Sequence, residues 1–126
     1  MMIYLAVALG GAIGGALRYW VGTLVDQRHE TPFPLGTLVV NVTGALLIGA
    51  FAALAQDWLT GLWWSALAIG LCGSYTTVSS FSLQCLQLVQ KQRPMLAAIY
   101  VLGSVIGCLL GTVIGFAAIS GLGMTA

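Results

Sequence analysis

The segment that decides the fold is Gly73-Ser74-Tyr75-Thr76-Thr77-Val78-Ser79-Ser80-Phe81-Ser82, a row of hydroxyl groups inside an apolar stretch. No charged residue occurs between Trp58 and Gln90. As one helix these residues would measure about 50 Å, against a membrane hydrocarbon core of about 30 Å. Hydroxyl side chains and glycine weaken a helix, and a broken helix in a membrane must be buried in protein or face a wet cavity. The segment predicts a break near Gly73 to Thr77, with a continuous polar-faced helix as the alternative.

The composition of the whole chain indicates a membrane protein. Of its 126 residues, 60% are apolar and only 6% are charged, whereas an average soluble domain carries roughly 25% charged residues. Such a chain lacks the charged surface of a soluble fold and the polarity of a disordered one. It has no basic run, which argues against nucleic acid as a partner. The length accommodates about four spanning helices of roughly 20 residues.

Charges and prolines divide the chain into four expected spans, which form one all-α transmembrane domain over residues 1–126. The spans are 3–25, 35–56, 62–90 and 95–119. The loops between them are expected at Asp26–Pro34, at Asp57–Gly61 and around Lys91, Arg93 and Pro94, where charges and prolines disfavour a helix. The tryptophans near the second loop fit an interfacial aromatic belt and are Trp58, Trp63 and Trp64.

Small residues mark the helix faces that pack closely. Glycine recurs every fourth residue from Gly103 to Gly115, and two glycine pairs lie between Gly10 and Gly15. Such stripes let another helix approach, and a chain this small is expected to pack against a second subunit. The cysteines have neither disulfide nor metal spacing and are interpreted as apolar packing residues; they are Cys72, Cys85 and Cys108.

Polar side chains inside a membrane are costly and are therefore candidates for function. The spans hold one cation, Arg18, and neutral hydrogen-bond donors such as Asn41, but no acid. Proton-coupled transport usually requires an intramembrane carboxylate or histidine, and no catalytic triad or metal-ligand cluster can be assembled, so an enzyme is not expected. The set suits an anion. The alternatives are an interhelical hydrogen bond for Asn41, core packing for Phe81 and a snorkelling side chain for Arg18.

Three motifs resemble the bacterial fluoride channel family (Fluc, also called CrcB). The first is Gly36-Thr37-Leu38-Val39-Val40-Asn41 followed by Gly44. The second is Gly73-x-x-Thr76-Thr77-x-Ser79-x-Phe81-Ser82, similar to the family's GxxTTFSTFS. The third is Gly14-x-x-x-Arg18 in the first span. The motifs keep the family's order, and the resemblance covers nearly the whole chain.

The resemblance implies a fold, a function and a set of site residues. Family members are antiparallel, dual-topology dimers in the bacterial inner membrane that export fluoride passively, with structural Na⁺ at the dimer interface. Fluoride would pass residues in the positions of Asn41, Phe81, Val78, Tyr100, Thr37 and Ser104. Arg18 would sit in a vestibule, and the backbone carbonyls of Gly73 and Thr76 would bind Na⁺. Expected partners are fluoride, the lipid bilayer and a second subunit.

Two departures from the family pattern bear on function. Val78 stands where the family's motif has its first phenylalanine, so a polarised ring edge is lost, and slower permeation or altered halide selectivity is expected. The first and third loops hold three Lys or Arg residues and the opposite side holds none, which favours one orientation. A homodimer is favoured, and a partner subunit of a heterodimeric channel is the alternative. A small dual-topology drug exporter is disfavoured because it would need a membrane-embedded glutamate.

Overall fold

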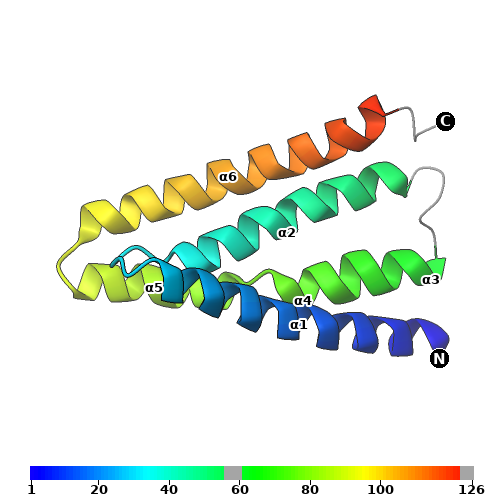
Figure 1. Ribbon diagram of the computed structural model, residues 1–126, viewed down its shortest axis with the longest axis horizontal. Coiled ribbons are helices and arrows are strands. Elements are labelled where there is room, and N and C mark those ends of the chain that lie inside the picture. The colour runs from blue at the N-terminus through cyan, green and yellow to red at the C-terminus, as the bar shows by residue number, and fades with distance from the viewer. Residues whose placement is uncertain (56–60, 123–126) are drawn as a thin grey trace.

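The computed structural model describes residues 1–55 and 61–122, and the helices there account for four spans. The elements are α1 (Met2–Arg28), α2 (Leu35–Leu54), α3 (Gly61–Trp64), the π-helix η1 (Ser65–Cys72), α4 (Gly73–Tyr75), α5 (Val78–Gln90) and α6 (Pro94–Gly121). The third span consists of α3, η1, α4 and α5 in succession (Figure 1). Each of the four stretches is long and apolar enough to cross a membrane, which confirms the predicted all-α membrane fold with four transmembrane helices.

The first helix runs further than the sequence predicted. Residues 26–28 were expected to begin a loop, but α1 continues to Arg28, so that prediction is wrong. Asp26 therefore lies on a helix rather than in a loop. The helix can extend past Asp26 because the prolines that block a helix, Pro32 and Pro34, come later in the chain. Its last hydrogen bond runs from the His29 N–H to the Val25 carbonyl over 3.1 Å. The predicted second loop, with Asp57 and Trp58, lies largely outside the described residues.

The spans pack in alternation rather than in sequence order. The most extensive contacts join α1 to η1 and α2 to α6, and Figure 1 shows α2 between α6 and the third span. The start of α1 and the end of α6 lie at the same end of the bundle, as four crossings require. Small residues allow the close approach: a Cβ atom on Gly49 would collide with the Thr112 carbonyl, and one on Gly115 with the Leu46 carbonyl.

The predicted glycine stripe of the fourth span is correct over three of its four positions. Gly107, Gly111 and Gly115 face α2, whereas a Cβ atom on Gly103 would meet no atom within 4 Å. The glycines of the first span serve the same purpose, since Gly10 and Gly14 lie against the backbone of η1. That π-helix was not predicted. π-Helical turns are rare and often lie near functional sites, and only the short helix α4 separates this one from the break.

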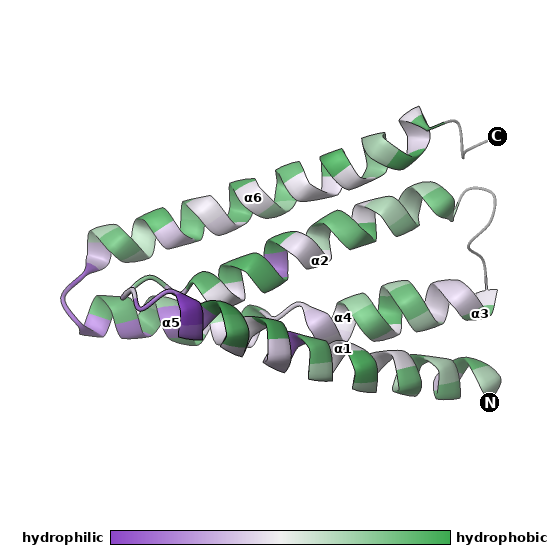
Figure 2. Cartoon of the chain, in the orientation of Figure 1, coloured by the Kyte–Doolittle hydropathy of each residue, from purple (hydrophilic) through white to green (hydrophobic). Residues whose placement is uncertain are grey.

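Hydrophilic residues gather at one end of the bundle, where α1 meets α2 and α5 meets α6 (Figure 2). Arg28, Lys91 and Arg93 all lie there and are exposed. The outward faces of the spans are apolar, as with Leu102, Leu109 and Val113 on α6. These faces fit contact with lipid chains.

Candidate anion site

The break in the third span lies at Thr76 and Thr77, within the predicted segment. Thr76 has φ −75° and ψ 156°, and Thr77 has φ −149° and ψ 118°, so both are extended. Gly73 itself remains helical as the first residue of α4. The prediction of a discontinuous span is therefore confirmed, and the break is narrower than the hydroxyl-rich segment.

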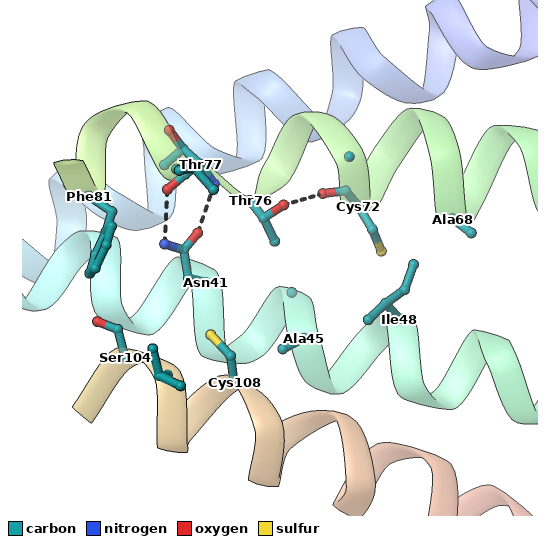
Figure 3. Close-up of a pocket in the computed structure, with 14 residues that line it drawn as sticks. Asn41, Ala45, Ile48, Ala68, Cys72, Thr76, Thr77, Phe81, Ser104 and Cys108 are labelled. Atoms are coloured by element: carbon teal, nitrogen blue, oxygen red, sulfur yellow. Dashed lines mark hydrogen bonds between the residues drawn. The ribbon is translucent and has the colours of Figure 1, made fainter. Parts of the chain in front are cut away.

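Asn41 on α2 closes a reciprocal pair of hydrogen bonds with Thr77. The Thr77 N–H donates to Asn41 Oδ1 over 2.7 Å, and Asn41 Nδ2 donates to the Thr77 carbonyl over 3.0 Å (Figure 3). This pairing fixes the amide orientation, because each side-chain atom faces a backbone group of the opposite kind. A carboxamide has two N–H donors, so one N–H of Asn41 is left after this pair is made.

Backbone carbonyls at the break lose their usual helical donors, among them those of Gly73 and Thr76. In a continuous helix the Thr77 N–H would bond to the Gly73 carbonyl and the Ser80 N–H to the Thr76 carbonyl. Here the Thr77 N–H goes to Asn41, and the Ser80 N–H goes to Thr77 Oγ1 over 3.2 Å as a helix cap. The carbonyls of Ser74 and Tyr75 likewise receive no backbone hydrogen bond from the described residues across the break. The family resemblance assigns Na⁺ to two of these freed carbonyls, those of Gly73 and Thr76. Carbonyl oxygens are suitable ligands for Na⁺.

A second connection ties the break to α2. Thr43 Oγ1 donates to the Val39 carbonyl over 2.7 Å, so it accepts a hydrogen bond from the Tyr75 hydroxyl at 2.9 Å. Between this bond and the Asn41 pair, Gly44 lies against the side chains of Tyr75 and Thr76, where a Cβ atom would collide with Thr76.

A cavity of about 440 Å³, here called the break cavity, opens between α2, the third span and α6. Figure 3 shows Asn41, Thr76 and Cys72 at its walls, with Phe81 and Ser104 at one end. Its described lining is mostly apolar and carries no charged side chain; it consists of Asn41, Gly44, Ala45, Ile48, Ala68, Cys72, Gly73, Thr76, Thr77, Val78, Phe81, Ser104, Val105 and Cys108.

Ser104 supplies an unpaired donor to the break cavity. Its side chain is only 6% exposed, and its Oγ has no hydrogen-bond partner among the described residues. Buried polar groups without partners are costly and uncommon in native proteins. Among the described residues, the Ser104 hydroxyl is therefore a free donor at the wall of the break cavity.

Aromatic packing holds Phe81 at the end of the break cavity. Its ring centroid lies 5.2 Å from that of Tyr100, which also makes an edge contact with Phe33 at 5.4 Å. Tyr100 is fully buried and does not line the cavity; its hydroxyl donates to Gln84 Oε1 over 2.8 Å. Tyr100 thus positions Phe81 from behind, and Phe81 is partly exposed to the cavity.

A second cavity of about 390 Å³, here called the arginine cavity, lies between α1, the start of α2 and the start of α5. Arg18, Asp26, Thr37 and Ser80 are among its lining residues. Thr77 lines both cavities. The predicted site residues are therefore divided: Asn41, Val78, Phe81 and Ser104 border the break cavity, and Arg18 and Thr37 border the arginine cavity.

Sequence reasoning missed several residues that organise the site. Thr77 was read only as part of a motif, although a threonine before a helix is a recognisable N-cap. Gln84 was not singled out, and nothing local in the sequence indicates that it meets Tyr100. Val78 was expected in the pore; it borders the break cavity but is 77% exposed.

Comparison with known proteins identifies close relatives. Residues 5–116 match the family described as CrcB-like protein, Camphor Resistance (CrcB). A "Fluoride-specific ion channel FluC" of Rhodospirillum rubrum is 46% identical over 118 residues, which cover 90% of this chain and 92% of the relative. The protein of the same name from Paramagnetospirillum magneticum is 43% identical over 94% of this chain and 95% of its own. "Fluoride-specific ion channel FluC 2" of Geobacillus kaustophilus is 38% identical over 93% of this chain and 92% of its own.

Proposed function

Because the chain belongs to the CrcB-like protein family, we propose that it is a fluoride-specific ion channel that exports fluoride passively and protects the cell from it. The observation that carries the proposal is the buried hydroxyl of Ser104 in the break cavity, which has no partner among the described residues. Asn41 lines the same cavity and has a second N–H beyond the one that it donates to Thr77. Neutral donors in an apolar cavity replace the water of a small anion without holding the anion as tightly as a fixed positive charge would.

The driving force for export is the membrane potential. A potential of −100 mV is worth roughly 2.3 kcal/mol for one charge, which supports a gradient of roughly fiftyfold. Such a passive route needs no proton relay. The described lining of the break cavity contains no carboxylate or histidine, in keeping with this mode of transport.

The proposed mechanism gives a role to six of the predicted site residues. Arg18 draws anions into the arginine cavity, which Thr37 and Thr77 also line. Asn41 and Ser104 donate to fluoride in the break cavity, where Phe81 presents its ring edge, the positive part of the aromatic quadrupole. Tyr100 supports Phe81 by direct ring contact.

We further propose an antiparallel dimer with Na⁺ bound by the Gly73 and Thr76 carbonyls. The donor set fits: both carbonyls have lost their helical donors, and Gly73 is exposed on the single chain. Bound Na⁺ would neutralise the carbonyl dipoles that the break leaves unpaired. A second subunit over this face would bury irregular backbone, which a membrane tolerates only inside protein or beside water.

The identity of the second subunit has two alternatives, which the exposed Val78 and the clustered cations bear on. A homodimer would carry valine in both copies of the motif, whereas a heterodimer could regain a ring from an inverted partner. One end of the bundle holds Arg28, Lys91 and Arg93. These cations favour an orientation in which that end faces the cytoplasm, on the inner side of a bacterial inner membrane. Reporters fused at the C-terminus test this: signal on both sides of the membrane would contradict a single orientation.

The proposed function is tested by efflux from liposomes. Purified protein is reconstituted in vesicles loaded with potassium fluoride, and release is started with valinomycin and recorded with a fluoride electrode; matched vesicles contain potassium chloride. Rapid fluoride release without chloride release is expected. Absence of fluoride release would contradict a channel formed by this chain alone, and co-reconstitution with an inverted relative would then test the partner-subunit alternative.

A further inference from the structure

We propose that Asn41 is a positioning residue for the cation site at the break, separately from its role as a donor to fluoride. Its Oδ1 atom takes the Thr77 N–H and thereby keeps the Gly73 carbonyl free for a cation. The inference rests on the proposed function, because it concerns the Na⁺ that the family resemblance implies. It assigns to one side chain two tasks that different substitutions separate.

The first step is the competition for one backbone donor. Thr77 follows Gly73 by four residues, the spacing of an α-helical hydrogen bond. If Asn41 did not accept the Thr77 N–H, this donor would have to find another acceptor inside the membrane, where an unpaired N–H costs several kcal/mol. The Gly73 carbonyl is the acceptor that helix geometry offers, and a carbonyl so engaged is a poorer ligand.

The second step is the division of the Asn41 amide into three parts. Oδ1 accepts from Thr77, one N–H donates to the Thr77 carbonyl, and the other N–H is available to the break cavity. The oxygen therefore acts on the backbone of the break, and the remaining N–H acts on an anion. An aspartate keeps an acceptor oxygen but loses both N–H donors, whereas leucine has nearly the same shape and neither function.

Other contacts between α2 and the break provide a matched control. Tyr75 directly precedes Thr76, and its hydroxyl forms a hydrogen bond with Thr43. This hydrogen bond does not involve the Thr77 N–H. Replacing Tyr75 by phenylalanine removes a hydrogen bond between the same two elements and keeps the ring beside Gly44. A general loosening of the break would therefore affect this variant as well.

The experiment measures thermal unfolding of the protein in nanodiscs as Na⁺ replaces N-methylglucamine at constant ionic strength. Wild type, Asn41→Asp, Asn41→Leu and Tyr75→Phe are compared, and fluoride efflux is recorded in parallel. We expect Na⁺ to raise the melting temperature of wild type. Asn41→Leu should need at least about tenfold more Na⁺ for half of the effect, the factor that corresponds to 1.4 kcal/mol. Asn41→Asp should keep its Na⁺ response while its fluoride efflux falls at least about tenfold, and Tyr75→Phe should respond like wild type.

Several results would overturn the proposal. An unchanged Na⁺ midpoint in Asn41→Leu would show that the oxygen does not control the site, and an equal shift in Tyr75→Phe would show general loosening. Loss of the Na⁺ response in Asn41→Asp would also contradict it. If Asn41→Leu does not fold, Asn41→Ala carries the same expectation. A wild type whose melting ignores Na⁺ would remove the cation site, while its fluoride efflux would still report on the channel.

Discussion

The hydroxyl of Tyr75 lies 2.9 Å from Thr43 Oγ1. Thr43 follows Asn41 by two residues on α2, so the two side chains leave the helix in directions about 200° apart. Asn41 and Thr43 thus form hydrogen bonds to the break from two sides of α2, and Gly44 packs against the side chains of Tyr75 and Thr76. The irregular backbone is therefore held by specific side chains of α2, and each of them can be tested by substitution.

Removing the Tyr75–Thr43 bond should cost a small, measurable amount of stability. Hydrogen bonds between transmembrane helices average about 0.6 kcal/mol in double-mutant cycles, and we expect this value for Tyr75→Phe with Thr43→Val. Unfolding in mixed micelles measures the free energy of unfolding of wild type, the two single variants and the double variant. Strictly additive effects of the two substitutions would mean that the hydroxyl pair contributes nothing.

Ser104→Ala should weaken conduction without weakening the fold. The Ser104 hydroxyl has no partner in the described structure, so its removal should leave the melting temperature unchanged or raise it. Fluoride efflux should fall roughly tenfold or more, since a hydrogen bond to a charged group is worth about 1.5–3 kcal/mol.

Ser65→Ala is the matched control for this substitution. Ser65 is also buried, but its hydroxyl donates to the Gly61 carbonyl over 2.9 Å, away from the break cavity. It should lower stability slightly and leave efflux intact. The same efflux from Ser104→Ala and wild type would exclude Ser104 from the pathway.

Alanine substitutions should distinguish glycines that join helices from glycines that do not. Gly49→Ala places a Cβ atom against the Thr112 carbonyl, and forcing α2 and α6 apart should cost about 1–3 kcal/mol. Gly103→Ala meets open space and should stabilise the helix by up to about 1 kcal/mol. Denaturant titrations of both variants provide the comparison; equal effects would contradict the assigned packing.

Val78→Phe should restore a polarised ring at the rim of the break cavity. We expect faster fluoride efflux or a higher ratio of fluoride to chloride efflux than in wild type. Val78→Leu adds bulk without a ring edge and serves as the control. Unchanged fluoride flux in Val78→Phe would count against a role for a ring at this position.

Arg18→Gln should slow fluoride entry chiefly at low ionic strength. Arg18 lines the arginine cavity, and electrostatic steering there should be worth roughly tenfold in rate. The Debye length shrinks from about 30 Å at 0.01 M salt to about 3 Å at 1 M, so the difference should shrink with added salt. Arg93→Gln, an exposed substitution outside both cavities, should have little effect on flux at any salt concentration.

The apolar composition, together with the charges and prolines that divide the chain, predicted the four spans, because burial in lipid requires every membrane helix to be long and apolar. The hydroxyl run predicted the break, since the competition between side chains and helical backbone is a local property. The first span was predicted to end at residue 25, but α1 continues to Arg28, because charged side chains at the membrane surface can remain on a helix.

The partners of the site residues could not be predicted in the same way. Asn41 was read either as an interhelical contact or as a fluoride donor, and the structure shows the contact and leaves one N–H over. Which backbone it meets depends on the packing of α2 against the third span. The Tyr100–Gln84 bond and the π-helix likewise arise from tertiary packing, which no local pattern encodes.

The alternating contacts of the bundle have a consequence for biosynthesis. α1 packs against the third span and α2 against α6, so no span has its principal neighbour beside it in the chain. As the protein leaves the ribosome, α2 enters the membrane before its partner has been made. Gly49 and its neighbours stay exposed to lipid until the last span arrives. Assembly is therefore complete only when α6 inserts, and a chain shortened before α6 would leave the face of α2 that contains Gly49 without its partner, a defect that membrane quality control could recognise.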